Sequence, residues 1–128
     1  MPVRGIRGAI TAGADTADGI FTATRLLLLA IIENNPGLNA LDIASVIFTT
    51  TDDLTASYPA QAARQIGWEA VPLMCAREIP VPGSLARCIR VLIHWNTSLP
   101  QSSIRHVYLG EASQLRPDLT PAAKKIGH

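Results

Sequence analysis

Three arginines stand inside otherwise apolar segments of this 128-residue sequence: Arg7, Arg90 and Arg116. Burying a guanidinium costs free energy unless an anion pairs with it. The planar guanidinium also binds a carboxylate through two parallel hydrogen bonds, which makes arginine well suited to small carboxylate ligands. We expect Glu78 to pair with one arginine and the other arginines to bind a small anionic ligand.

Each of these residues also has an ordinary structural interpretation. Arginines and glutamates are mostly exposed in proteins, so Arg7 and Glu78 are more simply interpreted as solvated side chains. Arg90 lies in the centre of an apolar strand, where a buried charge needs a reason. Tyr108 fits a half-buried ring whose hydroxyl makes a hydrogen bond. Spacing alone therefore predicts an anion site and no particular reaction.

Covalent catalysis and cofactor chemistry have little support in the sequence. It has no G-x-S-x-G elbow, no Walker loop and no G-x-G-x-x-G fingerprint. Cys75 and Cys88 fit neither a CxxC pair nor a zinc cluster, and we expect both to be small buried hydrophobic residues. We interpret the histidines, His94, His106 and His128, as structural or surface residues. No metal and no cofactor is predicted.

Composition argues against several classes of partner. Eleven basic and ten acidic residues give a formal net charge of +1, which supplies no general attraction to nucleic acid or to an anionic membrane. Aromatic residues make up 5% of the chain, which leaves few platforms for stacking single-stranded nucleic acid. The apolar run from Leu26 to Ile32 is far shorter than the ~20 residues of a membrane helix, and the N-terminus has no signal-peptide core. We expect a cytoplasmic protein.

The first half of the chain predicts the elements that position Arg7. Val3 to Thr11 is typical of a short or bulged strand interrupted by glycines, from which Arg7 projects. Asp15 and Thr16 offer an N-cap for a helix that runs to the Asn-Asn-Pro-Gly stretch, because the apolar residues between lie at helical spacing. Ile43 to Thr51 is dense in β-branched residues and predicts a buried strand.

The second half predicts the elements around Glu78 and Arg90. A helix over Ala60 to Ile66 follows a proline and stops at a glycine. A short strand over Val71 to Met74 precedes Glu78, which we place where the chain passes from strand to loop. Cys88 to Trp95 is the strongest strand signal, and its alternation puts Arg90 on the opposite face from its apolar neighbours.

The C-terminal part predicts less regular structure. We expect a helical turn over Gln101 to Ile104 and a strand over His106 to Leu109, with antiparallel strands near this hairpin-like region. Two helices and several strands indicate an α+β fold. The length suits one domain over residues 1–128, with 120–128 as a flexible tail.

Several short blocks are more specific than this general pattern. They occur in order along the chain: Val3 to Ala9, Tyr58 to Ala60, Gly67 with Trp68, Val71 with Pro72, Cys75 with Glu78, Cys88 to Val91, Ile104 to Leu109, and Leu115 to Leu119. Together they resemble the AroH class of chorismate mutases over nearly the whole chain.

The resemblance implies a fold, an assembly and a reaction. The fold would be a mixed sheet with helices on the outside, forming a pseudo-α/β-barrel in a homotrimer with three equivalent active sites between subunits. The reaction would be the intramolecular Claisen rearrangement of chorismate to prephenate, toward phenylalanine and tyrosine, without metal or organic cofactor. A pericyclic step needs no nucleophile, so the protein must hold the compact reactive shape and stabilise developing charge.

The resemblance also implies roles for the arginines and for the acidic and aromatic residues described above. Arg90 would place its guanidinium beside the ether oxygen that becomes negative, and would also bind a carboxylate. Arg7 would bind the side-chain carboxylate, with Tyr108 hydrogen-bonding nearby. Glu78, together with Cys75, would bind the ring hydroxyl and face the positive charge that develops on the ring.

Further contacts implied by the resemblance come from the neighbouring subunit and from the tail. Tyr58 would form a wall, Arg64 would supply a cationic contact, and Arg116 would help to cover the cleft. Binding contacts are also expected next to Glu78, along Met74, Cys75, Ala76 and Arg77.

Two residues depart from the family pattern. Gln61 stands where the family often has a lysine, which would weaken long-range attraction of a dianion. Met74 stands where a small polar residue is usual, so we expect any ligand contact there to use the backbone. Two other functions stay open: a trimeric imine or enamine deaminase, and a noncatalytic binder of small aromatic-pathway carboxylates.

Overall fold

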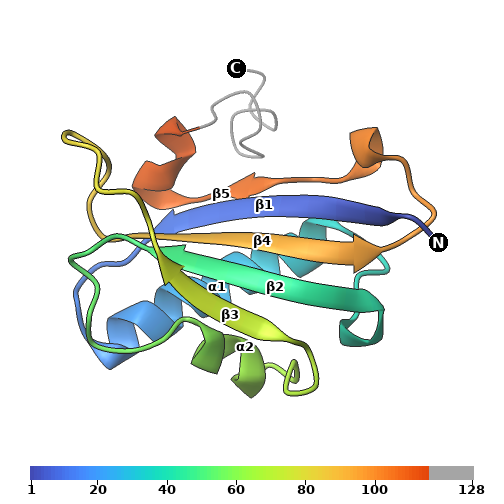
Figure 1. Ribbon diagram of the computed structural model, residues 1–128, viewed down its shortest axis with the longest axis horizontal. Helices are drawn as coiled ribbons and strands as arrows, with labels where there is room; N and C mark the ends of the chain where they lie inside the picture. Colours follow the sequence, from blue (N-terminus) through green and yellow to red (C-terminus); the bar gives the residue numbers. More distant parts are fainter. Residues whose placement is uncertain (116–128) are drawn as a thin grey trace.

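The computed structural model describes residues 1–115, which form a five-stranded mixed sheet with two helices on one face (Figure 1). The strand order is β3-β2-β4-β1-β5. The strands are β1 (Val3–Thr11), β2 (Ile43–Thr50), β3 (Leu73–Arg77), β4 (Cys88–Asn96) and β5 (Val107–Tyr108), and the helices are α1 (Ala17–Asn34) and α2 (Ala60–Gln65). The predicted α+β class with a mixed sheet is confirmed.

Strand directions follow from the connections. β4 pairs antiparallel with both β1 and β2, whereas β3 is parallel to β2. A parallel pair needs a crossover, and α2 provides it between β2 and β3. The connections through α1 and α2 cover the same face of the sheet, which leaves the other face of the described residues without an α-helix (Figure 1).

The expectation of antiparallel pairing near the C-terminus is right for β4 and wrong for β5. The chain does reverse after β4, through a short 3₁₀ turn at Gln101–Ser103, as predicted. However, β1 occupies the place between the two arms of this reversal. Because β1 is antiparallel to β4, the returning strand β5 runs parallel to β1.

Two other strand predictions need correction. β1 has the predicted bounds, Val3 to Thr11, but it has no bulge, since its pairing with β4 runs without a register shift. The strand expected over Val71 to Met74 starts later, at Leu73. Pro72 has no backbone N–H, and the N–H of Val71 is used in a turn to the carbonyl of Trp68, at 3.1 Å.

The core lies between the sheet and α1. The helix begins where Thr16 accepts a hydrogen bond from the Gly19 N–H at 2.9 Å, so Thr16, of the two predicted candidates, is the N-cap. Its fully buried residues pack against alternate residues of the strands. The members of this cluster with no solvent exposure include Ile20, Leu27, Leu28, Ile31, Ile6, Phe48, Ile89 and Ile93.

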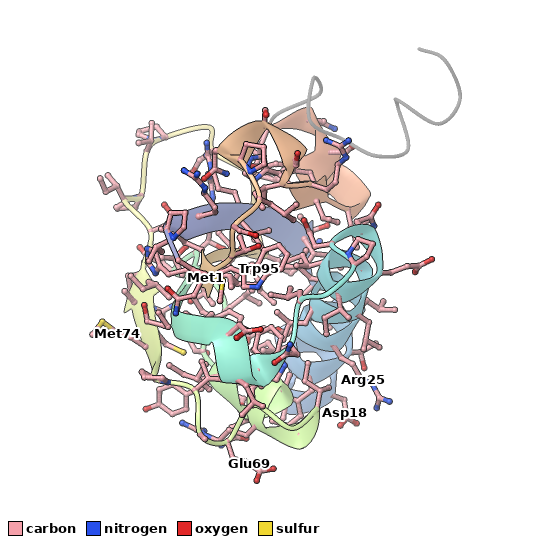
Figure 2. All side chains as sticks on the ribbon, turned by 90° about the vertical axis from the view of Figure 1, so that its right-hand side faces the viewer. Met1, Asp18, Arg25, Glu69, Met74 and Trp95 are labelled. Carbon is pink, nitrogen blue, oxygen red and sulfur yellow. The ribbon has the colours of Figure 1, made fainter. Side chains whose placement is uncertain are left out.

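Gly8 allows α1 and β5 to approach β1 closely. A Cβ atom added there would lie 2.9 Å from the Ile31 Cδ1 atom and 3.2 Å from the Val107 carbonyl oxygen. The opposite face, which carries no α-helix within residues 1–115, is the outer face of the sheet. Figure 2 shows Met74 on that side of the molecule, far from Asp18 and Arg25 on α1. Chemistry-bearing residues of the strands gather on this outer face.

No helix within residues 1–115 is long and apolar enough to cross a membrane. The predicted tail 120–128 and the residues of the Leu115 to Leu119 block beyond Leu115 lie outside the described part of the chain.

Candidate active site

A cleft on the outer face brings together four of the polar residues singled out in the sequence. Arg7 comes from β1, Arg90 from β4 and Tyr108 from β5, while Glu78 directly follows β3. The cleft has a volume of about 320 Å³. We call it the arginine cleft, and it is lined by Arg7, Gly8, Ile47, Thr49, Glu78, Arg90, Val91, Leu92 and Tyr108.

Strand register explains why these side chains meet. Ala9 of β1 lies opposite Arg90 on one side and opposite Tyr108 on the other. On its β2 side, Arg90 lies opposite Thr49. Arg7 is two residues before Ala9 and therefore projects from the same face of β1. A small residue at position 9 leaves room above the sheet between the larger polar groups.

Glu78 is held by two side chains of the arginine cleft. Its Oε2 atom lies 3.5 Å from Nε of Arg90, which makes the predicted arginine–glutamate ion pair. The Thr49 hydroxyl donates a hydrogen bond to the same oxygen. The Glu78 N–H donates to the carbonyl of Thr50 at 3.0 Å, which continues the pairing of β3 beyond its last residue. The carboxylate is thus fixed at the point where strand gives way to loop, as predicted.

The guanidinium of Arg90 keeps hydrogen-bonding capacity for a ligand. Its Nε atom is buried, and within residues 1–115 it has the ion pair with Glu78 but no hydrogen-bond acceptor. The Arg90 side chain is 36% exposed and the Glu78 side chain is 28% exposed. A partly desolvated cation next to a carboxylate can stabilise a new negative charge on one side and a positive charge on the other.

A second cleft lies at the edge strand, around Tyr58. Its volume is also about 320 Å³, and we call it the tyrosine cleft. It is lined by Tyr58, Ala60, Gln61, Arg64, Leu73 and Cys75. Cys75 and Glu78 therefore line different clefts of the same chain.

Comparison with known proteins fits this geometry. The pattern of the type I chorismate mutase family matches residues 3–119. The chain is 60% identical over 120 residues to the chorismate mutase AroH of Thermus thermophilus, an alignment that covers 94% of this chain and 98% of the relative. It is 45% identical over 121 residues to the chorismate mutase AroH of Bacillus subtilis, with 94% of each chain covered.

This chain belongs to the type I chorismate mutase family. The solved structure of a chorismate mutase from Clostridium thermocellum superimposes with a TM-score of 0.83 at 51% identity, covering 86% of this chain and 97% of that one. Members of the family are isomerases that convert chorismate to prephenate in aromatic amino acid biosynthesis. The family and function predicted from the sequence are confirmed.

The remaining residues that the family resemblance singled out lie at different places. Met74 is 63% exposed on the outer face of β3. Ala76 and Arg77 line a third hollow with Tyr58 and Cys75. Arg116 lies outside the described residues. The contacts predicted for these residues with a ligand stay predictions.

Arg77 already has three partners in its own chain. Its Nη1 atom donates to Thr50 Oγ1 at 3.1 Å, to the Thr51 carbonyl at 2.7 Å and to the Leu54 carbonyl at 2.8 Å. These bonds attach β3 to the segment that follows β2. Arg77 therefore stabilises the conformation of the chain near the tyrosine cleft, in addition to any contact that it makes with a ligand.

Burial separates the two cysteines. Cys88 has no solvent exposure and packs with Ala9, Tyr108 and Ala112 beside the arginine cleft. This burial raises the pKa of the Cys88 thiol, although the nearby Arg90 opposes the effect. Cys75 is half-buried. The expectation of a small buried hydrophobic residue is confirmed for Cys88 and holds only in part for Cys75.

Two of the histidines have structural hydrogen bonds. His94 Nδ1 lies 2.9 Å from the Ser45 hydroxyl oxygen, and His106 Nδ1 accepts from the Arg7 N–H at 2.9 Å. His128 lies outside the described residues. Within residues 1–115, no group of three or more histidine, cysteine or acidic side chains is arranged to hold a metal ion.

Sequence reasoning missed Thr49 as a member of the site. The alternation of β2 contains a signal, since Thr49 lies on the opposite face from the core residue Phe48. The sequence alone does not predict the pairing that brings β2 next to β4. Without that register, the hydroxyl has no predicted partner.

Proposed function

We propose that this protein converts chorismate to prephenate at sites formed between the subunits of a homotrimer, with Arg90 as the central catalytic group. The observation that supports this most strongly is the Arg90–Glu78 pair, placed in the arginine cleft of a chain that belongs to the family. A cation and an anion side by side match a reaction in which a C–O bond breaks with charge separation.

The rearrangement needs shape and electrostatics rather than a nucleophile. Arg90 donates hydrogen bonds to the ether oxygen as negative charge develops there, and also binds a carboxylate. Glu78, fixed by Thr49, binds the ring hydroxyl and faces the positive charge on the ring. Arg7 and Tyr108 bind the side-chain carboxylate. Holding both ends of the substrate favours the compact conformer from which the bond can form.

The proposed trimer completes the site. Tyr58 and Arg64 lie in the tyrosine cleft of their own chain, away from Arg90. If the tyrosine cleft of one subunit faces the arginine cleft of the next, then Tyr58 forms a wall and Arg64 adds a cation. Tyr58 and Met74 are 66% and 63% exposed in the single chain, which suits residues that a second subunit covers.

Two further parts of the proposal rest on the family. The three sheets form a pseudo-α/β-barrel with helices outside, and Arg116 helps to cover the cleft. The protein acts in the cytoplasm, as a biosynthetic enzyme of this family.

The direct experiment adds purified protein to chorismate, without added metal or cofactor, and follows loss of chorismate and appearance of prephenate. We expect strong acceleration over the uncatalysed reaction. Binding of chorismate without acceleration would instead support the noncatalytic binder. Light scattering after size-exclusion chromatography checks the assembly, because a fully active monomer contradicts sites that need two subunits.

A further inference from the structure

The segment that carries Tyr58 is held by hydrogen bonds from three other parts of the chain. This segment, residues 51–58, connects β2 to α2, and we call it the Tyr58 loop. Its Leu54 side chain is 2% exposed and joins the hydrophobic core. Tyr58 itself is 66% exposed. The position of an exposed ring at the end of a loop depends on how firmly the loop is held.

Asp15 holds one side of the Tyr58 loop. Its Oδ1 atom accepts hydrogen bonds from the Thr55 N–H at 2.9 Å and from the Ala56 N–H at 3.0 Å. Its Oδ2 atom accepts a third from the Thr55 hydroxyl at 2.9 Å. Asp15 is free to do so because Thr16, not Asp15, caps α1. The carboxylate therefore binds the loop two residues before Tyr58.

Arg77 holds a second side of the loop. Its Nη1 atom donates to the carbonyls of Thr51 and Leu54, at 2.7 and 2.8 Å. The loop is also bonded to the chain at the start of β4, where the Arg87 N–H donates to the Asp53 carboxylate. It is thus attached to the start of α1, to the end of β3 and to the start of β4. Pro59, which follows Tyr58 directly, restricts the backbone further as α2 begins.

The contacts of Asp15 favour its ionised form. The hydrogen bonds from the Thr55 and Ala56 amides and the Thr55 hydroxyl, with a smaller contribution from Arg77, lower the pKa of the Asp15 carboxyl. The side chain lies at the surface, so water competes for every one of these bonds. Three simultaneous bonds from consecutive residues give the contact a defined geometry that one exposed bond would lack.

We propose that Asp15 is a positioning residue for the reaction, whose carboxylate fixes the Tyr58 loop so that Tyr58 forms the wall of a neighbouring subunit's substrate site. This inference rests on the proposed function. Asp15 touches no substrate and acts through Tyr58. Its loss lets the ring move away from the bound substrate, which weakens selection of the compact conformer.

The test compares Asp15→Ala with Asp15→Asn. We expect Asp15→Ala to lower kcat/KM about threefold to tenfold, mostly through a higher KM. Asp15→Asn keeps an Oδ1 acceptor for both amides, and its NH₂ group can donate to the Thr55 hydroxyl, so it should recover most of the loss. The matched control is Asp18→Ala, because Asp18 is an exposed acid in the first turn of α1 that, within residues 1–115, makes no hydrogen bond to the loop.

A double-mutant cycle with Tyr58→Ala separates positioning from general stability. If Asp15 acts through Tyr58, adding Asp15→Ala to Tyr58→Ala lowers kcat/KM little further. An equal further loss in the Tyr58→Ala background overturns the proposal, as does an Asp15→Ala enzyme with normal kcat/KM. Unfolding midpoints of all variants check that the folded fraction is unchanged.

Hydrogen exchange distinguishes failure of this inference from failure of the proposed function. Faster exchange of the Thr55 and Ala56 amides in Asp15→Ala, together with unchanged kcat/KM, overturns the positioning role and leaves the mutase activity standing. Wild-type protein without turnover of chorismate overturns the proposed function itself, and the positioning role with it.

Discussion

The arginine cleft and the tyrosine cleft are built in different ways. Arg7 and Arg90 project from β1 and β4, interior strands that are hydrogen-bonded on both sides. Tyr58 and Arg64 project from a loop and a six-residue helix beside the edge strand β3. Groups that stabilise a developing charge need fixed positions, because their reorganisation during the reaction would raise the activation free energy. Groups that only enclose the substrate can stand on the periphery, provided that local contacts hold them.

The largest effect should come from the centre of the arginine cleft. We expect Arg90→Ala to lower kcat by a factor of about 10² to 10³ or more, since it removes a donor aimed at a developing oxygen charge. Arg90→Lys should recover little, because an ammonium group lacks the planar fork. Circular dichroism and the size of the assembly should stay as in wild type. Near-normal turnover in Arg90→Ala would remove Arg90 from the centre of the mechanism.

A mixing experiment tests whether the two clefts belong to one site. Arg90→Ala and Arg64→Ala should each give trimers of low activity. When the two variants are unfolded together and reassembled in equal amounts, about a quarter of the sites should combine an intact arginine cleft with an intact tyrosine cleft. Activity should rise to about that fraction of wild type. Mixed trimers that stay as inactive as their parents would show that each site uses a single chain.

The smallest expected effect is a difference in thiol reactivity between the two cysteines. Cys75 lines the tyrosine cleft, whereas Cys88 is buried with a raised pKa, so a thiol-alkylating reagent should modify Cys75 first. Chorismate should slow the modification of Cys75, and Cys88 should react only as the chain unfolds. Mass spectrometry of partly modified protein identifies the site. Earlier modification of Cys88 in folded protein would contradict the close packing of Cys88 with Ala9, Tyr108 and Ala112.

Periodicity was enough to predict the elements that carry most of the arginine cleft. The alternation in β4 put Arg90 on the outer face, and the loop signals placed Glu78 at the end of a strand. Both follow from local backbone geometry, in which successive side chains of a strand point to opposite faces. The identity of the reaction came instead from the family resemblance, because an anion site alone fits many functions.

The features that could not be predicted depend on which strands become neighbours. The parallel pairing of β5, the bond from Thr49 to Glu78 and the hold of Asp15 on Thr55 join segments far apart in the sequence. Asp15 shows the difficulty well. Its sequence context is that of a helix cap, and only the folded chain shows that its neighbour takes that role.

The close approach at Gly8 has a consequence for how freely β1 can change. Inward, Ile6 and Gly8 are constrained by contact with α1, where an added methyl group already meets Ile31. Outward, Arg7 and Ala9 are constrained by the arginine cleft and by Tyr108. We therefore expect few substitutions between Ile6 and Ala9 to be neutral, since a change on the inner face disturbs folding and a change on the outer face disturbs the chemistry.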